Sequence, residues 1–243
     1  GGISVKGLTP KPRLGNPPSR IAETPSGMLN SVGLQNPGID AFLSDMPRLS
    51  RLGTAIVANV AGSSEEDYAL MTRKLRGSGV DLVELNISCP NVREGGVAFG
   101  VQPEMVERIT RIAKAECEQP LIVKLTPNVA DIAANARAAQ EGGADAISLI
   151  NTLTGMAIDP VRRRPILHNV TGGLSGPAVK PVALRMVYQA HKAVTIPVIG
   201  MGGIMTGRDV VEFMLAGATA VMVGTANICD PMACPRIITE LEV

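Results

Sequence analysis

The feature that most constrains this chain is a regular alternation of short apolar runs with stretches of helical spacing. Seven runs read as strands, and they cover residues 3–6, 55–59, 81–86, 121–125, 146–151, 197–200 and 220–224. Five intervening stretches have the periodicity of helices, and they cover residues 65–76, 103–116, 129–141, 179–193 and 207–216. Because strands that are apolar on both faces and alternate with helices belong to parallel sheets, the pattern predicts a parallel sheet covered by helices.

A closed barrel is the fold class that this alternation favours. Such a barrel needs eight parallel strands, whereas seven are visible, and the first begins almost at Gly1 without an initiator Met. We therefore expect an α/β chain with a (β/α)8 TIM barrel that lacks its N-terminal strand, in one N-terminally incomplete domain over residues 1–243. An open doubly wound sheet is the alternative, but its usual Gly-x-Gly-x-x-Gly turn after the first strand is absent.

Composition narrows the class of protein. The chain has a net charge of +1, which gives no general attraction to nucleic acid or to an anionic membrane. No apolar run reaches the roughly 18 residues of a membrane span, and no signal peptide is evident. The four cysteines form no C-x-x-C pair, which fits reduced thiols and a cytoplasmic protein.

Two segments, residues 7–53 and 152–177, are too long to be simple connections. The first is rich in proline and then in glycine and polar residues, and the second carries the basic run Arg162–Arg164. Long segments inside a compact domain usually form lids and binding walls, so we expect that role for both.

Polar residues and glycines gather where the predicted strands end. The carboxyl ends of the strands form the active site of a parallel barrel, so these residues predict one converging site. Some polar residues are expected at any strand exit, but so many exits of this kind favour a site. They are Lys6, Asn59, Asn86, Cys89, Lys124, Asn151, Thr152, Gly200–Gly203, Gly224 and Thr225.

The last two strand ends indicate a phosphate. Gly200–Gly203 leads into a helix that starts after Thr206, and Gly224 with Thr225 follows the next strand. Glycines let backbone N–H groups approach an anion, and the place after strands seven and eight is the usual phosphate seat of such barrels. The alternative is that these glycines merely form tight turns.

Lysines and asparagines at the strand ends indicate a planar polar ligand. Lys6 and Lys124 can offset negative charge on a bound group, including the charge that a flavin acquires on reduction, although Lys6 could equally extend into solvent. Carboxamides offer donors and acceptors without charge, which suits a pyrimidine or a flavin ring, although Asn91 is most plausibly a turn residue. These carboxamides are Asn30, Asn59, Asn86, Asn91 and Asn151.

Cys89 follows a strand in a polar loop. A free thiol has a pKa of about 8.5, so Cys89 could accept a proton or act as a nucleophile. The alternative is a small buried apolar residue. There is no Ser-His-Asp or Cys-His pairing and no metal-ligand cluster, so a hydrolase or a metal site has little support.

With these residues in view, the chain resembles the dihydroorotate dehydrogenase family over essentially its whole length. Nine motifs in order carry the resemblance. One of them, E-L-N-I-S-C-P-N-V from Glu84, contains an Asn-x-Ser-Cys-Pro-Asn element that related flavin-dependent pyrimidine reductases share, so it is the nine together that are specific. Cysteine at the position of the base, followed by residues 95–100, is similar to the class 1B catalytic subunits, whereas class 2 enzymes have serine there. The nine motifs are residues 6–16, 26–38, 57–62, 84–92, 123–129, 150–156, 171–178, 199–204 and 223–227.

The resemblance implies an FMN enzyme of de novo pyrimidine synthesis that oxidises (S)-dihydroorotate to orotate. Cys89 would remove the C5 proton while a hydride passes from C6 to flavin N5. The substrate would be held by Lys6, Asn30, Ser31, Val32, Gly33, Leu34, Asn86, Asn151 and Thr152. FMN would be held by Lys6, Gly7, Asn59, Asn86, Lys124, Ile150, Gly176, Gly202, Gly203, Gly224 and Thr225.

The resemblance to class 1B also implies an α₂β₂ assembly, with a homodimer of this chain at its centre. Its second subunit would carry FAD and a [2Fe-2S] cluster and pass electrons to NAD⁺. Three alternatives remain: a class 1A fumarate-linked enzyme, a reductase like dihydropyrimidine dehydrogenase, and a non-catalytic barrel that acts as a scaffold.

Overall fold

The computed structural model describes residues 1–87 and 99–242, which form two compact units. The first unit contains Gly1–Gly15, Gly33–Leu125 and Ala134–Ile147. The second contains Asn16–Val32, Thr126–Ala133 and the chain from Ser148 onward. The single domain expected from the sequence stays a prediction.

A seven-stranded sheet contains all seven strands that the sequence predicts. Within each unit, neighbouring strands of this sheet pair in parallel. Val57 lies beside Leu82, for example, and Val83 lies beside Leu121. The chain passes from the first unit to the second within the fifth of these strands. In sheet order the strands are β1 (Gly2–Ser4), β4 (Ala55–Val60), β5 (Leu82–Asn86), β6 (Leu121–Lys124), β7 (Ala146–Leu149), β12 (Val198–Met201) and β13 (Ala220–Met222).

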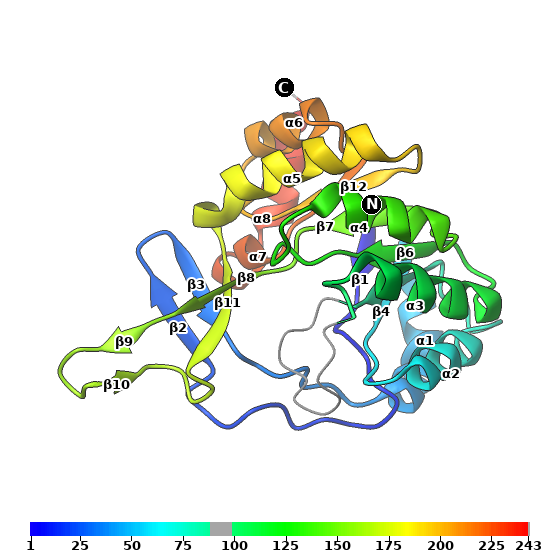
Figure 1. Ribbon diagram of the computed structural model, residues 1–243, viewed down its shortest axis with the longest axis horizontal. Coiled ribbons are helices and arrows are strands. Elements are labelled where there is room, and N and C mark those ends of the chain that lie inside the picture. The colour runs from blue at the N-terminus through cyan, green and yellow to red at the C-terminus, as the bar shows by residue number, and fades with distance from the viewer. Residues whose placement is uncertain (88–98, 243) are drawn as a thin grey trace. The chain divides into compact units, whose positions relative to one another are not determined.

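The helices of the first unit cover the buried strands with apolar faces. In α3, Val106, Ile109, Thr110 and Ala113 are buried, and this spacing keeps them on one side of the helix. α2 and α3 pack side by side (Figure 1). The helical elements of this unit are α1 (Ile39–Leu49), η1 (Ser50–Leu52), α2 (Glu65–Lys74), α3 (Pro103–Glu116) and most of α4 (Ile132–Glu141).

Helix ends in both units follow the expected capping chemistry. The Ser64 hydroxyl accepts from Asp67 N at 3.2 Å, and Thr206 forms a capping box with Asp209. Gly143 and Gly217 have φ values of +94° and +105° just after α4 and the helix Gly207–Leu215, a backbone conformation that favours glycine. α4 begins later than the predicted residue 129.

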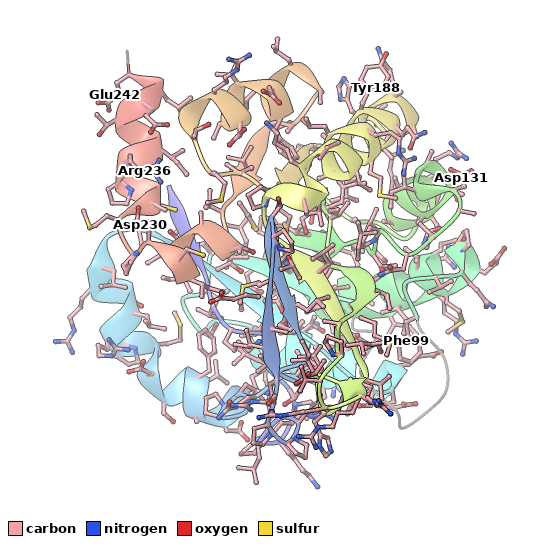
Figure 2. All side chains as sticks on the ribbon, turned by 90° about the vertical axis from the view of Figure 1, so that its left-hand side faces the viewer. Phe99, Asp131, Tyr188, Asp230, Arg236 and Glu242 are labelled. Carbon is pink, nitrogen blue, oxygen red and sulfur yellow. The ribbon has the colours of Figure 1, made fainter. Side chains whose placement is uncertain are left out.

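The sequence pattern did not predict two helices of the second unit, the short α7 (Thr225–Cys229) and the longer α8 (Ala233–Leu241). Figure 2 labels Arg236 on α8, with Asp230 before the helix and Glu242 just after it. Arg236 lies 3.5 Å from Asp230 and 3.1 Å from Glu240. The other helical elements are η2 (Pro177–Val179), α5 (Lys180–Ala193) and α6 (Gly207–Leu215).

A four-stranded antiparallel sheet in the second unit joins the two long segments of the sequence (Figure 1). Ala22, Leu29 and Leu167 form its small buried core. Beside it lies a cavity of about 350 Å³, lined by Thr24, Pro25, Ser26, Leu29, Gly155, Met156, Leu174 and Ala178. The sheet order is β2 (Ile21–Thr24), β3 (Gly27–Asn30), β11 (Thr171–Ser175) and β8 (Leu153–Met156), and β9 (Ile158–Asp159) pairs with β10 (Arg164–Pro165).

The helices within residues 1–87 and 99–242 were searched for membrane spans. None is both long enough and apolar enough to cross a bilayer.

Candidate active site

Four polar side chains lie on one face of the first unit's sheet, near the carboxyl ends of three adjacent strands. Asn59 of β4 is the register partner of Glu84 in β5, and Asn86 of β5 is the partner of Lys124 in β6. Glu84 and Asn86 are two residues apart, so their side chains point to the same face. We call Asn59, Glu84, Asn86 and Lys124 the polar quartet.

Hydrogen bonds connect the polar quartet. Asn86 Nδ2 donates to Asn59 Oδ1 at 3.3 Å, and Asn59 Nδ2 donates to Glu84 Oε2. Lys124 Nζ lies 3.7 Å from the same Glu84 oxygen. Asn59 is 4% exposed and Glu84 is 0% exposed, so the network is largely removed from water. It therefore presents fixed donors, acceptors and one ammonium group at a strand-end face.

The segment after β1 runs close to the polar quartet. A Cβ atom at Gly7 would lie 2.9 Å from Asn59 Oδ1 and 3.2 Å from Leu34 Cδ2, so only glycine fits there. Leu34 has a φ of +55° and follows Gly33 at +76°. Lys6 is exposed and lies beyond β1, which ends at Ser4 rather than at the predicted residue 6. The first unit thus brings together Gly7, Leu34, Asn59, Asn86 and Lys124.

Tyr68 of α2 contacts residues on both sides of segment 88–98. Its hydroxyl donates to Asn86 O at 3.0 Å, and its ring meets that of Phe99 edge to face, with centroids 6.1 Å apart. Figure 2 labels Phe99. Cys89, the predicted base, lies outside the described residues.

In the second unit, the ends of β3 and β7 meet on β11. Asn30 Nδ2 donates to Gly173 O at 3.5 Å, and a Cβ atom at Gly173 would lie 2.0 Å from Thr152 Oγ1. Asn151 Oδ1 accepts from Thr152 N at 2.8 Å, and Asn128 Nδ2 donates to Thr152 O at 3.0 Å. Asn30, Asn151 and Thr152 therefore lie in one region, and their role in holding a substrate stays a prediction.

Ser31 has a buried hydroxyl for which the described residues provide no hydrogen-bond partner. Its backbone is fixed, because Ser31 N donates to Arg20 O at 2.7 Å and Asn16 Nδ2 donates to Ser31 O at 2.9 Å. Val32 O accepts from Asn16 N at 3.0 Å. A buried hydroxyl without a partner is costly, so Ser31 Oγ fits a site that a polar ligand completes.

Glycines bring the ends of β11, β12 and β13 together in the second unit. Gly176, Gly202 and Gly203 have φ values of +98°, +124° and +79°. A Cβ atom at Gly203 would lie 2.8 Å from Gly176 O, and one at Gly202 would lie 3.2 Å from Ile150 Cγ1. The backbone of Gly203 thus approaches that of Gly176 too closely for a side chain, and Gly202 packs against the side chain of Ile150.

Gly224 and Thr225 complete this glycine-rich region. Thr225 Oγ1 donates to Ser175 Oγ at 2.9 Å. A Cβ atom at Gly224 would meet nothing within 4 Å, so its backbone borders open space. The second unit thus brings together Ile150, Gly176, Gly202, Gly203 and Thr225, as the sequence predicts, and the phosphate itself stays a prediction.

The carboxylate of Asp209 holds the loop after β12 in place through hydrogen bonds and an ion pair. Asp209 accepts from Met205 N at 2.8 Å and from Thr206 N at 2.9 Å, and it pairs with Lys180 Nζ at 2.6 Å. Burial alone would raise the pKa of Asp209, but the hydrogen bonds from Lys180 and from these two N–H groups together lower it below its ordinary value. Hydrogen bonds to Asp209 and Glu212 raise the pKa of Lys180.

The family comparison covers the whole chain. The family model described as "Dihydroorotate dehydrogenase" matches residues 1–243. The chain belongs to the dihydroorotate dehydrogenase family.

Among the described residues, no group of three or more His, Cys, Asp or Glu could hold a metal ion.

Curated relatives in this family are identical to the chain at more than half of the aligned residues. The "Dihydroorotate dehydrogenase B (NAD(+)), catalytic subunit" of Alkaliphilus metalliredigens is 60% identical over 243 residues, which is 100% of this chain and 80% of the relative. The protein of the same name from Listeria welshimeri is 54% identical over 245 residues, which is 100% of this chain and 81% of the relative.

A solved structure shows the same fold. The crystal structure of DHODH from Eimeria tenella in complex with ferulenol has a TM-score of 0.82 and 26% identity, and the match covers 98% of this chain and 73% of that one. The parallel sheet of seven strands with its alternating helices is part of a (β/α)8 barrel. The predicted family, class, fold class and oxidoreductase activity are confirmed.

Sequence reasoning missed three residues that support the site. Glu84 lies within one of the nine motifs and has no predicted role, although a charged residue between the apolar Val83 and Leu85 is a signal for one. Asn128 also lies within one of the motifs. Tyr68 has no signal in the sequence, because nothing in helical periodicity shows which strand end a hydroxyl will reach.

Proposed function

We propose that this chain is the catalytic subunit of an NAD⁺-linked dihydroorotate dehydrogenase that oxidises (S)-dihydroorotate to orotate with FMN in pyrimidine synthesis. The relatives named dihydroorotate dehydrogenase B support the reaction. The observation that carries the proposal is the polar quartet, which places two carboxamides and a lysine on one strand-end face.

The residues present fit FMN. The first unit offers Asn59, Asn86 and Lys124, whose amide and ammonium groups match the donors and acceptors along a flavin ring. The second unit offers Gly176, Gly202, Gly203, Gly224 and Thr225, where close backbones and one hydroxyl suit a phosphate group. Lys6, Gly7 and Ile150 complete the proposed cofactor residues.

When bound, FMN would supply the acceptor for the hydride that leaves substrate C6. Lys124 would place its positive charge beside the ring and favour the negative charge that reduction produces. Asn59 and Asn86 would fix the orientation of the ring through directional hydrogen bonds. Thr225, whose hydroxyl donates to Ser175 Oγ, would lie at the phosphate end.

Polar groups from each of the two units would hold the substrate. Asn30, Asn86 and Asn151 can pair with the alternating N–H and C=O groups of a pyrimidine ring. Ser31 Oγ, which is buried without a partner among the described residues, would gain one from the substrate. Lys6, Val32, Gly33, Leu34 and Thr152 complete the proposed substrate residues.

Cys89 would act as the base, and this role rests on the sequence. Its thiolate would take the proton from C5, in the step that forms the C5=C6 double bond of orotate. A positioned base typically contributes a factor of about 10²–10⁴ to the rate.

A partner subunit would carry the electrons away. The relatives are named as catalytic subunits, which supports a second subunit. We propose that it is an iron–sulfur flavoprotein with FAD and a [2Fe-2S] cluster, joined to a homodimer of this chain in a heterotetramer. A cytoplasmic location stays a prediction from the sequence.

The test is an absorbance spectrum of the FMN-loaded protein during anaerobic addition of dihydroorotate. We expect a yellow protein whose flavin band bleaches, with orotate formed in equal amount. A protein that binds no FMN, or whose band persists, would support the scaffold alternative. Bleaching by dihydrouracil instead would indicate a reductase like dihydropyrimidine dehydrogenase. Reoxidation by fumarate, with no transfer to NAD⁺ through the partner, would indicate class 1A.

A further inference from the structure

Glu84 is a carboxylate in the middle of a buried strand. Its neighbours Val83 and Leu85 are 0% exposed, and so is Glu84 itself. Glutamate is almost never fully buried unless it is paired, because removing a carboxylate from water costs several kcal/mol. The position of Glu84 therefore depends on what its oxygens contact.

Two of its contacts are residues of the proposed FMN site. Asn59 Nδ2 donates to Glu84 Oε2, and Lys124 Nζ lies 3.7 Å from the same oxygen. The Lys124 side chain is only 18% exposed, so water screens this pair weakly. The Glu84 carboxylate thus contacts both Asn59 and Lys124, two residues that we propose bind the flavin.

The carboxylate also fixes the direction of the carboxamides. An ionised carboxylate can only accept hydrogen bonds, so Asn59 must turn its NH₂ group toward Glu84 and its carbonyl oxygen away. That oxygen accepts from Asn86 Nδ2, which leaves Asn86 Oδ1 facing away from Asn59. The single charge on Glu84 therefore sets the donor and acceptor ends of two side chains.

Stability alone does not account for this arrangement. Replacing a buried ion pair with apolar residues of similar volume is often neutral or stabilising, so such a pair is weak evidence for a structural role. Glu84 also offsets part of the positive charge of Lys124, which would otherwise act in full on a neighbouring group.

We propose that Glu84 is a positioning residue that orients Asn59 and Asn86 toward FMN and, by offsetting the charge of Lys124, keeps the reduction potential of the bound flavin lower than Lys124 alone would set it. This inference rests on the proposed function. It adds a tuning residue that touches Asn59 and Lys124 in the described structure.

The test is the FMN reduction potential of Glu84→Gln, measured by equilibration with a reference dye. Glutamine keeps the size and removes the charge, so Lys124 acts unopposed. We expect the ratio of reduced to oxidised FMN at a fixed potential to rise at least tenfold, about 30 mV for a two-electron couple. Glu107→Gln, on α3 with a partly exposed side chain, is the matched control and should leave the potential unchanged.

Lys124→Gln is the second variant. Its FMN reduction potential should fall, because the charge of Glu84 is then no longer offset by a lysine. Unchanged potentials in FMN-loaded Glu84→Gln and Lys124→Gln would overturn the inference. Failure of both variants to bind FMN would overturn it too, since the pair would then hold the site together rather than tune it. If the unaltered protein binds no FMN, it is the proposed function that fails.

Discussion

The two units present different chemical groups at the ends of their strands. In the first unit, β4, β5 and β6 end in side chains: two carboxamides, a buried carboxylate and a lysine that contact one another. In the second unit, β11 and β12 end in glycines at positive φ, whose backbones approach within distances that no side chain allows. The strand ends of the first unit therefore offer polar side chains, and those of the second unit offer backbone groups.

The difference shows that the two units suit two kinds of recognition. A ring that gains charge on reduction needs groups whose charge and direction are fixed, and side chains can supply these. A phosphate needs several N–H groups close together, which glycine-rich loops supply. We therefore expect substitutions in the first unit to change chemistry and ring binding, and those in the second to change phosphate binding.

The largest effect should come from Cys89→Ala, which follows β5 of the first unit. FMN should remain bound, but reduction by dihydroorotate should slow by about 10²–10⁴-fold because the positioned base is lost. Stopped-flow absorbance measures this rate. Cys117→Ala, a partly buried thiol at the end of α3, is the control and should reduce normally. A Cys89→Ala protein that reduces at the original rate would remove Cys89 as the base.

A smaller effect should follow from Asp209→Asn, which breaks the support of the glycine loop in the second unit. Losing charged hydrogen bonds to Lys180, Met205 and Thr206 should lower the free energy of unfolding by about 1–3 kcal/mol at neutral pH. Chemical denaturation measures this loss. Asp40→Asn, which has an exposed ion pair with Lys74, should change the unfolding midpoint much less.

The same variant tests the direction in which the free energy of unfolding changes with pH. Because the pKa of Asp209 is lowered in the folded protein, its contribution is present above the unfolded pKa of about 3.9 and is lost as the pH falls through the folded value. The raised pKa of Lys180 gives the converse, a contribution present below about pH 10.4 and lost as the pH rises above it. Asp209→Asn should lack the acid loss that depends on Asp209, and a wild-type acid profile in this variant would contradict the assignment.

The smallest effect should come from Tyr68→Phe in the first unit. Removing the hydroxyl leaves Asn86 O without this donor and should cost about 1 kcal/mol of unfolding free energy. Thermal and urea unfolding measure it. Tyr188 on α5 is 53% exposed and provides the control, since Tyr188→Phe should change stability negligibly. Equal losses in both variants would show that the Tyr68 hydroxyl has no special role.

The sequence predicts the parallel strands and their order well, because long apolar runs and glycine stops are local signals. It places Asn59, Asn86 and Lys124 at strand ends for the same reason. The antiparallel sheet of β2, β3, β8 and β11 could not be predicted, because it joins segments more than one hundred residues apart, such as Asn30 and Gly173. Glu84 was missed as a partner because only the register of β4 and β5 brings it beside Asn59.

The division between ring and phosphate recognition is tested most directly by comparing FMN with riboflavin, which lacks the phosphate. Calorimetry would give both affinities for the unaltered protein, for Asn59→Ala and for Gly203→Ala, which places a Cβ atom 2.8 Å from Gly176 O. Gly203→Ala should reduce the preference for FMN by about tenfold or more and leave riboflavin affinity within about twofold, while Asn59→Ala should weaken both flavins equally. A preference that survives in Gly203→Ala, or that disappears in Asn59→Ala, would contradict the account.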